Sequence, residues 1–278
     1  MPTYETTGPI TAVIEFDIAS VRVSASKRTD VVVHVAPATA DVELDVKAAQ
    51  QTKVDFAGGR LTLKGPRKRN VFGRVGSVEV LIELPAGSEV HGDAPLANFV
   101  TEGPLGDCRL KTSLGRIQVE HAANAWLKTD HGDVRLESSD GDAEVSGLGR
   151  IEIGTVGGTL TVKNSNGDTE VAEVHGNLKV NSSFGRIEVG TAHAGVDAKT
   201  ANGPIRIGRV ERGQVTLQTS LGDLEVGIAE GTAAWLDIHS KVGRLRNQLG
   251  AAAGPGEARE TVEVRGHTEL GDIEIRRS

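Results

Sequence analysis

The chain has 278 residues and a formal net charge of −7, from 31 lysines and arginines against 38 aspartates and glutamates. Acidic and basic residues are mixed along the chain, whereas a nucleic-acid-binding protein usually has a basic face or stripe. We therefore expect no nucleic-acid partner. The single cysteine, Cys108, excludes an internal disulfide and a cysteine-rich metal site.

The beginning of the chain has neither the basic nor the apolar segment of a secretory signal. No run of about 18 consecutive apolar residues is present to span a membrane. We therefore expect a cytoplasmic protein without direct membrane insertion. Glycine is abundant at 35 residues and aromatic residues make up only 3%, which is typical of many short strands joined by tight turns.

Alternating apolar residues in the first part of the chain predict strands, at residues 12–18, 21–23, 31–35, 42–46, 61–63 and 78–84. These strands do not share the repeat that follows them. We assign residues 1–90 to an antiparallel N-terminal β-sheet that caps the rest of the chain. Such a cap would cover backbone groups that the open end of a repeat leaves unpaired.

A repeated sequence pattern begins near residue 106. It consists of two alternating apolar residues, a polar turn, a glycine and two more alternating apolar residues. Its turn glycines are 17 to 19 residues apart, at positions 115, 132, 149, 167, 185, 203 and 222. Looser copies follow at Gly243 and Gly271. A constant period of this length indicates one repeating structural unit.

A period near 18 residues suits one coil of a β-solenoid, whose coils are about 4.8 Å apart. We predict an all-β fold with a solenoid of 17–19-residue coils over residues 91–278 and a flexible loop near 248–260. The second and fourth residues after each glycine should point inward, as Ile117 and Val119 do after Gly115. Cys108 falls in an inward position, which predicts a buried structural thiol.

Charged residues directly follow the turn glycines and alternate in sign along the chain. If the coils stack in register, opposite charges of neighbouring coils attract each other. We predict a structural charge ladder, with a gap at Pro204, formed by Arg116, Asp133, Arg150, Asp168, Arg186, Asp223, Arg244 and Asp272.

Histidines and glutamates recur at another fixed position of the repeat, and would form a column on neighbouring coils. His175 and His193 lie eight residues after their turn glycines, and Glu211 and Glu230 take the same place in the next two repeats. Imidazoles beside carboxylates could hold a divalent metal, but polar residues are also usual at a solvated turn. We predict no cofactor and no tight metal binding, with His175, His193 and Glu211 as the candidate ligands if a metal binds.

The two tryptophans, Trp126 and Trp235, occupy outward positions by the same alternation. An exposed tryptophan can anchor a partner, or it can pack beneath a neighbouring loop. We take both residues as candidates for an interaction surface.

Three stretches carry a family resemblance: residues 76–88, which read GSVEVLIELPAGS, the glycine repeats, and residues 271–277, which read GDIEIRR. They resemble the bacterial β-strand-repeat family named "putative adhesin", of actinobacterial type and unknown function. The resemblance covers most of the chain and implies a β-solenoid-like fold with no defined catalytic residues. Because some relatives take part in envelope-stress signalling, it also implies a role in stress or envelope-related signalling.

No motif of a known catalytic site occurs in the chain. We therefore expect that the protein is not an enzyme. We expect a non-catalytic interaction or scaffold module that binds a protein partner. A self-assembling β-helical structural element is one alternative, and a β-helix carbohydrate-active enzyme is another. The sequence leaves the oligomeric state open.

Overall fold

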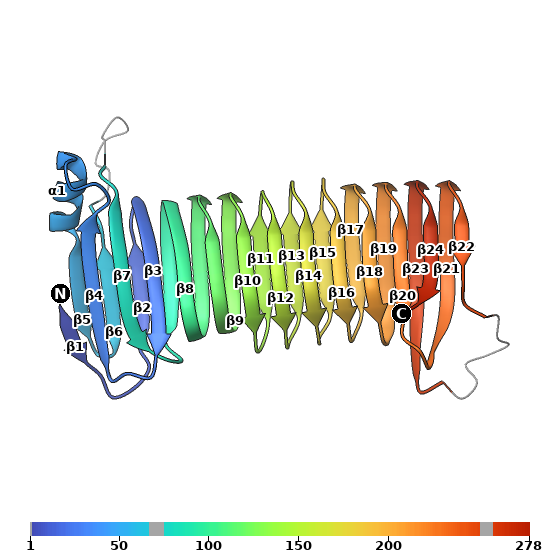
Figure 1. Ribbon diagram of the computed structural model, residues 1–278, viewed down its shortest axis with the longest axis horizontal. Helices are drawn as coiled ribbons and strands as arrows, with labels where there is room; N and C mark the ends of the chain where they lie inside the picture. The colour runs from blue at the N-terminus through green and yellow to red at the C-terminus, as the bar shows by residue number, and fades with distance from the viewer. Residues whose placement is uncertain (1, 67–74, 251–257) are drawn as a thin grey trace. The chain divides into compact units, whose positions relative to one another are not determined.

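The computed structural model describes residues 2–66, 75–250 and 258–278, whose contacts divide the chain into two compact units, Met1–Ser139 and Asp140–Ser278. Both units are built almost entirely of β-strands (Figure 1). The prediction of an all-β solenoid is confirmed. Of the loop predicted near 248–260, residues 251–257 lie outside the described residues.

The second unit is a solenoid in which each coil contributes one strand to each of two facing parallel sheets. One sheet contains β11 (Ala143–Gly147), β13 (Leu160–Asn164), β15 (Leu178–Ser182), β17 (Val196–Asn202), β19 (Gly213–Leu221), β21 (Thr232–Val242) and β23 (Glu260–Leu270). The other contains β12 (Ile151–Val156), β14 (Thr169–Val174), β16 (Ile187–Ala192), β18 (Ile205–Val210), β20 (Leu224–Ile228), β22 (Leu245–Asn247) and β24 (Ile273–Arg277).

The coils of this unit stack in register at the predicted period. Leu160 pairs with Leu178, and Leu178 pairs with Val196, each 18 residues further along the chain. Inward residues of both sheets form the core, and the predicted inward pairs Ile187 with Val189 and Ile205 with Ile207 are fully buried. The period-2 alternation therefore gave the correct inward face, because successive side chains of a strand point to opposite sides of its sheet.

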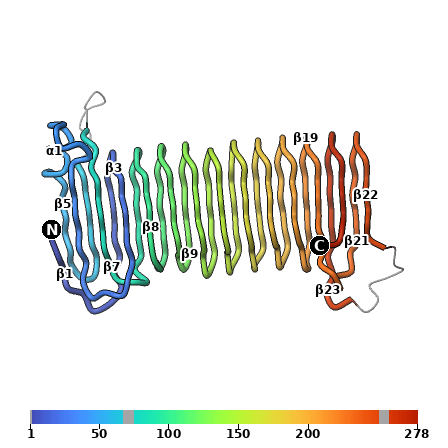
Figure 2. The backbone as a smooth tube through the Cα atoms, in the orientation of Figure 1, coloured from blue at the N-terminus to red at the C-terminus, as the bar shows by residue number. Residues whose placement is uncertain are grey.

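The last strands of the second unit do not stack in chain order. β23 pairs with β19 on one side and with β21 on the other, and β24 lies between β20 and β22. The coil nearest the C-terminus is therefore inserted between two coils that precede it in sequence, as the tube in Figure 2 shows. Each of its strands is hydrogen-bonded on both sides.

The first unit contains β1 (Thr3–Glu5), β2 (Thr11–Glu15), β3 (Ile18–Ser26), β4 (Asp30–Pro37), α1 (Glu43–Gln51), β5 (Lys53–Ala57), β6 (Arg60–Lys64), β7 (Val78–Pro85), β8 (Glu89–Leu114), β9 (Ile117–His131) and β10 (Val134–Ser139). Its outer strands are antiparallel, with β4 between β1 and β7 and with β5 beside β6. Its inner strands are parallel. β2 pairs in parallel with β6 on one side and β8 on the other, and β3 pairs in parallel with β7 and β8. Near the N-terminus, too, a coil is inserted between two others.

The strand predicted at 42–46 is wrong, because this segment enters helix α1. The alternation of Val42 and Leu44 misled the prediction, since both side chains are exposed. Glu43 pairs with Lys47 one helical turn away at 2.6 Å, a spacing that favours a helix. The Asp45 carboxylate accepts hydrogen bonds from the backbone N–H groups of Thr39 (3.1 Å) and Ser77 (2.7 Å), which fixes the helix against the sheet.

The turn glycines form columns in which each glycine lies against the backbone of a neighbouring coil. Gly185 has a φ of 120°, and a Cβ atom added there would overlap the carbonyl oxygen of Gly167. Gly203 repeats this arrangement against Gly185. Only glycine combines this φ with such a close approach of two backbones.

No helix among the described residues is long and apolar enough to cross a membrane.

We predict that Gly185→Ala lowers the free energy of unfolding by about 2–3 kcal/mol, because the new methyl group must displace a neighbouring coil from a positive-φ position. Urea unfolding followed by circular dichroism measures the change. Gly8→Ala is the control, since nothing lies within 4 Å of a Cβ atom added at Gly8. Equal stabilities of the two variants would contradict the packing argument.

Candidate functional sites

The predicted charge ladder is present in the first unit as one pair. The Arg116 Nη2 atom lies 3.8 Å from Asp133 Oδ2, and both side chains are more than half exposed. An ion pair this exposed contributes only about 0–1 kcal/mol. It favours one register of the coils and makes little difference to their stability.

In the second unit, the arginines of the ladder meet a carboxylate that the sequence analysis did not include. Glu170 binds Arg150 at 3.0 Å and Arg186 at 2.9 Å. The Arg186 guanidinium also lies 3.6 Å from Asp168. The hydrogen bond with Glu170 raises the pKa of the Arg150 guanidinium. Two positive charges therefore share an acidic residue from the strand between them.

The predicted alternation fails after Pro204, because the coils there do not follow chain order. Asp272 lies next to Asp223, since its backbone N–H donates to Asp223 Oδ1 at 2.7 Å. Arg244 lies beyond Asp272, and its backbone N–H donates to Asp272 Oδ1 at 2.8 Å. Two aspartates are therefore neighbours where the sequence order predicted Arg244 beside Asp223.

These contacts give the ladder aspartates a second role, as acceptors for the backbone of the next coil. The N–H of Arg186 donates to Asp168 Oδ1 at 2.9 Å in the same way. A backbone N–H that donates to a carboxylate partly compensates its negative charge, even where no cationic side chain lies beside it. This explains why Asp223 and Asp272 can follow each other in the column.

We predict that Asp168→Ala lowers the free energy of unfolding by about 1 kcal/mol, because the Arg186 N–H loses its acceptor. Asp168→Asn keeps an oxygen at the same place and should lose less than half as much. Urea unfolding of both variants tests this. Equal losses would mean that the charge of Asp168, and not its hydrogen bond, is the stabilising feature.

Cys108 is fully buried on β8, as predicted. Burial raises the pKa of its thiol to about 12. Because the thiolate is the reactive form, this cysteine has a packing role.

Trp126 points outward from β9 of the first unit and is 36% exposed. It lines a surface hollow of about 880 Å³ together with Phe16, His91, Arg109 and Lys111. An aromatic ring beside a few polar groups is a usual combination in ligand-binding hollows. The sequence analysis named this tryptophan but not the hollow.

Three carboxylates line the same hollow: Glu15, Asp17 and Asp93. Glu15 and Asp93 are partners in the parallel pairing of β2 with β8, although they are 78 residues apart in the sequence. The sequence analysis did not bring these three carboxylates together, because the pairing that gathers them crosses the order of the chain.

Trp235 points outward from β21 of the second unit and is 57% exposed. A neighbouring loop was the alternative cover for this residue, and residues 251–257 of the predicted loop lie outside the described residues. In the same coil, the inward residues Ala234, Leu236 and Ile238 are only half-buried. This coil therefore exposes both of its faces in part.

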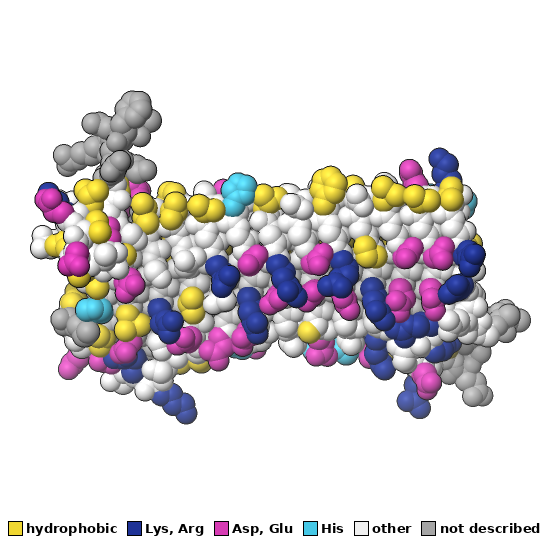
Figure 3. All heavy atoms as spheres, turned by 45° about the horizontal axis from the view of Figure 1, so that its top comes forward, with side chains coloured by type: hydrophobic (Ala, Val, Ile, Leu, Met, Phe, Trp, Pro, Cys, Tyr) yellow, Lys and Arg dark blue, Asp and Glu magenta, His cyan; other side chains and the backbone are white. Residues whose placement is uncertain are grey.

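An apolar edge runs along the glycine turns of the second unit, and the sequence analysis missed it. It consists of the residues directly before four turn glycines, which are between 44% and 58% exposed: Phe184, Leu221, Leu270 and Val242. Leu270 pairs with Leu221 on one side and with Val242 on the other, so the last three are neighbours. Figure 3 shows apolar side chains in a row at the upper margin of the molecular surface, apart from the charged side chains below.

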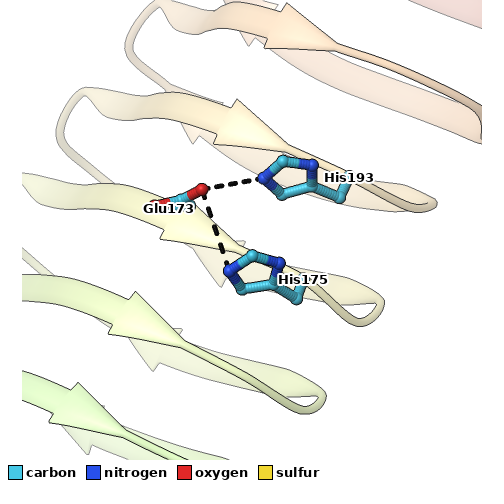
Figure 4. Close-up of side chains that lie close together, drawn as sticks. All are labelled: Glu173, His175 and His193. Atoms are coloured by element: carbon cyan, nitrogen blue, oxygen red, sulfur yellow. Dashed lines mark hydrogen bonds and ion pairs between the residues drawn. The ribbon is translucent and has the colours of Figure 1, made fainter.

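The candidate metal ligands His175 and His193 lie at the opposite turns of the second unit, where their rings stack with centroids 4.5 Å apart. Glu173, which the sequence analysis did not name, joins them (Figure 4). Its Oε1 atom lies 2.8 Å from His193 Nε2 and 3.8 Å from His175 Nε2. Glu211 Oε2 lies 2.8 Å from the other ring nitrogen of His193, Nδ1.

Glu230 does not belong to this column. The pairing of β18 with β20 shifts by one residue between Ile207 and Val210. Ala229 therefore donates its N–H to Val210, as Glu211 does to Ala192 one coil earlier. A count of residues from the turn glycine cannot reveal such an irregularity.

Hydrogen bonds to Glu173 and Glu211 raise the pKa of His193, and the bond to His193 lowers the pKa of Glu211. The cause is geometric, because both ring nitrogens of His193 face carboxylates. Only the imidazolium has an N–H group for each of them. The protonated ring is therefore the form that this arrangement stabilises.

We predict that Glu211→Gln lowers the pKa of His193, because one of the two carboxylates loses its charge. A histidine with a raised pKa stabilises the fold fully below its unfolded pKa of about 6.5, and this stabilisation disappears as pH rises through the folded value. The stability difference between wild type and variant should therefore shrink as pH rises through the folded pKa of His193. It should also shrink in acid, where Glu211, whose pKa is lowered, becomes protonated.

NMR titration of the histidine ring protons in chelator-containing buffer measures this pKa. Glu188→Gln is the control, since Glu188 pairs with Arg186 at the other turn of the same coil. The prediction would be contradicted if the pKa of His193 were the same in Glu211→Gln as in wild type.

Comparison with known families identifies the chain. A family model described as Toastrack DUF4097 matches residues 12–276. The chain belongs to the Toastrack family. The Toastrack fold is a β-solenoid, so the predicted resemblance to a β-repeat family of unknown function is confirmed. The actinobacterial type stays a prediction.

No curated protein matches this Toastrack chain. Among solved structures, a "putative adhesin" from Bacteroides fragilis is 9% identical, with a TM-score of 0.29 and coverage of 99% of this chain and 95% of that one. A "putative adhesin" from Parabacteroides distasonis is 13% identical, with a TM-score of 0.31 and coverage of 98% and 95%. A "putative cell adhesion protein" from Clostridium sporogenes is 11% identical, with a TM-score of 0.22 and coverage of 100% and 98%.

Proposed function

We propose that this Toastrack chain is a non-catalytic interaction module that binds a protein partner along the apolar edge of its second unit. The observation behind the proposal is the row of large apolar side chains at the glycine turns, Phe184, Leu221, Leu270 and Val242. Outward positions on the flat sheets are mostly polar or charged, whereas this row is apolar.

The spacing of the row suits a partner that runs along the stack of coils. Leu221, Leu270 and Val242 belong to paired strands, which are about 4.8 Å apart. Phe184 lies two coils from Leu221, with Asn202 between them. Full burial of a leucine or phenylalanine side chain contributes about 1.5–3 kcal/mol, and these residues are about half buried already. These contacts would form the apolar centre of a larger interface, where a few residues usually carry most of the binding energy.

Charged residues follow the apolar residues after the turn glycine and would form the rim of the interface, among them Arg186, Asp223 and Asp272. Interfaces commonly combine an apolar centre with a polar rim. The mixed signs of these charges would select the orientation of the partner more than they would add affinity.

A carbohydrate-active enzyme is the second candidate, and the hollow of the first unit favours it. Glu15, Asp17 and Asp93 line this hollow beside Trp126, and glycoside hydrolysis uses two carboxylates on either side of the bond that is cleaved. Turnover of a polysaccharide panel that Asp93→Asn abolishes would establish this function and overturn our proposal of a non-catalytic module.

End-to-end self-assembly is supported by the half-exposed inward residues of β21. Light scattering of the purified chain over a range of concentrations distinguishes it from our proposal. Growth beyond a small, fixed oligomer would favour assembly.

We predict that the triple variant Phe184→Ser, Leu221→Ser and Leu270→Ser folds normally but loses its partner, because these side chains are exposed and contribute little to the core. A photo-reactive residue at position 242 of the otherwise unchanged chain should cross-link one protein species in the native cell. The triple variant with the same photo-reactive residue at position 242 should not cross-link it.

The matched control replaces three exposed residues on the flat sheet, with Lys179→Ser, Gln218→Ser and Arg265→Ser. This variant should capture the partner as wild type does. Capture that survives the edge substitutions, or that fails in both variants alike, would contradict an interface at the apolar edge.

A further inference from the structure

The histidine cluster has a property that the interaction function does not use. Among the described residues, Glu173, His175 and His193 are the group whose ligand atoms lie close enough for one metal ion, all within 4.8 Å of one another. The cluster arises from the register of the solenoid, since residues 18 apart in the sequence lie side by side on neighbouring coils. Glu173 belongs to the same coil as His175, two residues before it.

The distances are close to those of a bound ion. Zinc binds histidine nitrogen and carboxylate oxygen at about 2.0–2.2 Å, so two ligands of one tetrahedral ion lie roughly 3.4 Å apart. Glu173 Oε1 already lies 2.8 Å from His193 Nε2 and 3.8 Å from His175 Nε2. The remaining movement is a rotation of two stacked rings, which the partial exposure of these side chains leaves room for.

Glu211 supplies the outer contact that metal-binding histidines usually have. It accepts the hydrogen bond of His193 Nδ1 at 2.8 Å. This contact keeps the proton on Nδ1, so that Nε2 faces Glu173 and can bind a metal ion once its own proton is released. Such carboxylate–histidine pairs orient the ring and increase its basicity. Arg209 lies 3.3 Å from Glu211 and holds this carboxylate in place.

The donor set selects the kind of metal. Two imidazoles and one carboxylate suit zinc and its neighbours among the divalent transition metals, whereas magnesium and calcium prefer sites made of oxygen ligands alone. Three protein ligands leave at least one position open, and the side chains of Glu173, His175 and His193 are 39%, 49% and 25% exposed. Water, or a group from another molecule, can complete the coordination.

We propose that Glu173, His175 and His193 bind a divalent transition-metal ion of the zinc class, with Glu211 as the residue that positions His193. Binding through Nε2 replaces the proton on that atom, which is released to solvent. The site lies at the turns opposite the glycine turns of the second unit, and the proposal does not depend on the function of the apolar edge.

The test is calorimetric titration of zinc chloride into the untagged full chain, after chelator treatment and dialysis into a non-coordinating buffer. We expect one zinc ion per chain. His175→Ala and Glu173→Gln should each weaken binding by at least about tenfold, and Glu211→Gln, which alters only the outer contact, by about tenfold. Excess magnesium should not compete.

The chain contains a matched control in His239 and His267, which also stack on neighbouring coils of the same unit, with centroids 5.6 Å apart. In the part of the chain that the structure describes, no third ligand joins this pair. His267→Ala should therefore bind zinc as wild type does. Circular dichroism of every variant verifies that the fold is intact.

Cobalt substitution provides a second readout, because tetrahedral cobalt absorbs visible light strongly. The band should appear with wild type and His267→Ala and be absent with His175→Ala. No zinc binding by wild type, equal binding by Glu173→Gln and wild type, or an equal loss with His267→Ala would each overturn the proposal.

Discussion

The fold depends on the contact between the turn glycine of one coil and the backbone of the next. At these turns a backbone carbonyl oxygen of the neighbouring coil fills the space that a side chain would need, as that of Gly167 does beside Gly185. At some of these turns the glycine carbonyl oxygen also accepts a hydrogen bond from a buried threonine three residues before the neighbouring turn glycine. Thr219 donates to Gly203 at 3.0 Å, and Thr268 donates to Gly222 at 2.9 Å. Because a buried carbonyl group without a partner is costly, this pairing fixes where each coil must turn.

A fixed turn produces the columns on which both candidate surfaces of the second unit depend. Once the coils are in register, residues at equal distances from their glycines become neighbours, whatever their chemistry. At one set of turns this gathers Phe184, Leu221, Leu270 and Val242 into an apolar edge. At the other set it stacks His175 on His193. The core positions are constrained by packing, whereas these edge positions are free to carry function.

Insertion of a coil near each terminus is the second organising feature. β2 and β3 lie between coils that follow them in the sequence, and β23 and β24 lie between coils that precede them. A strand paired on both sides satisfies its backbone groups more completely than an edge strand does. In the first unit, the outer coil is followed by antiparallel strands and by α1, which contacts β4 and β7. In the second unit, the coil of β21 and β22 keeps its inward residues half-exposed.

The sequence by itself determined the all-β solenoid, its period and its inward face. These features depend on local alternation and on glycines at fixed spacing, and both can be read without knowing which strands pair. It also determined the burial of Cys108 and the proximity of His175 to His193, since these follow from the period alone. Only the tertiary structure decided the features that depend on pairing across the order of the chain. The placement of Asp272 between Asp223 and Arg244, the shift that removes Glu230 from the histidine column, and the meeting of Glu15 with Asp93 are of this kind. The helix at Glu43–Gln51 belongs with them, because contacts of Asp45 with distant backbone groups fix a segment whose own alternation suggests a strand. A repeat in the sequence specifies each coil and the distance to the next one, but the order in which coils stack is set by the free energy of the whole assembly.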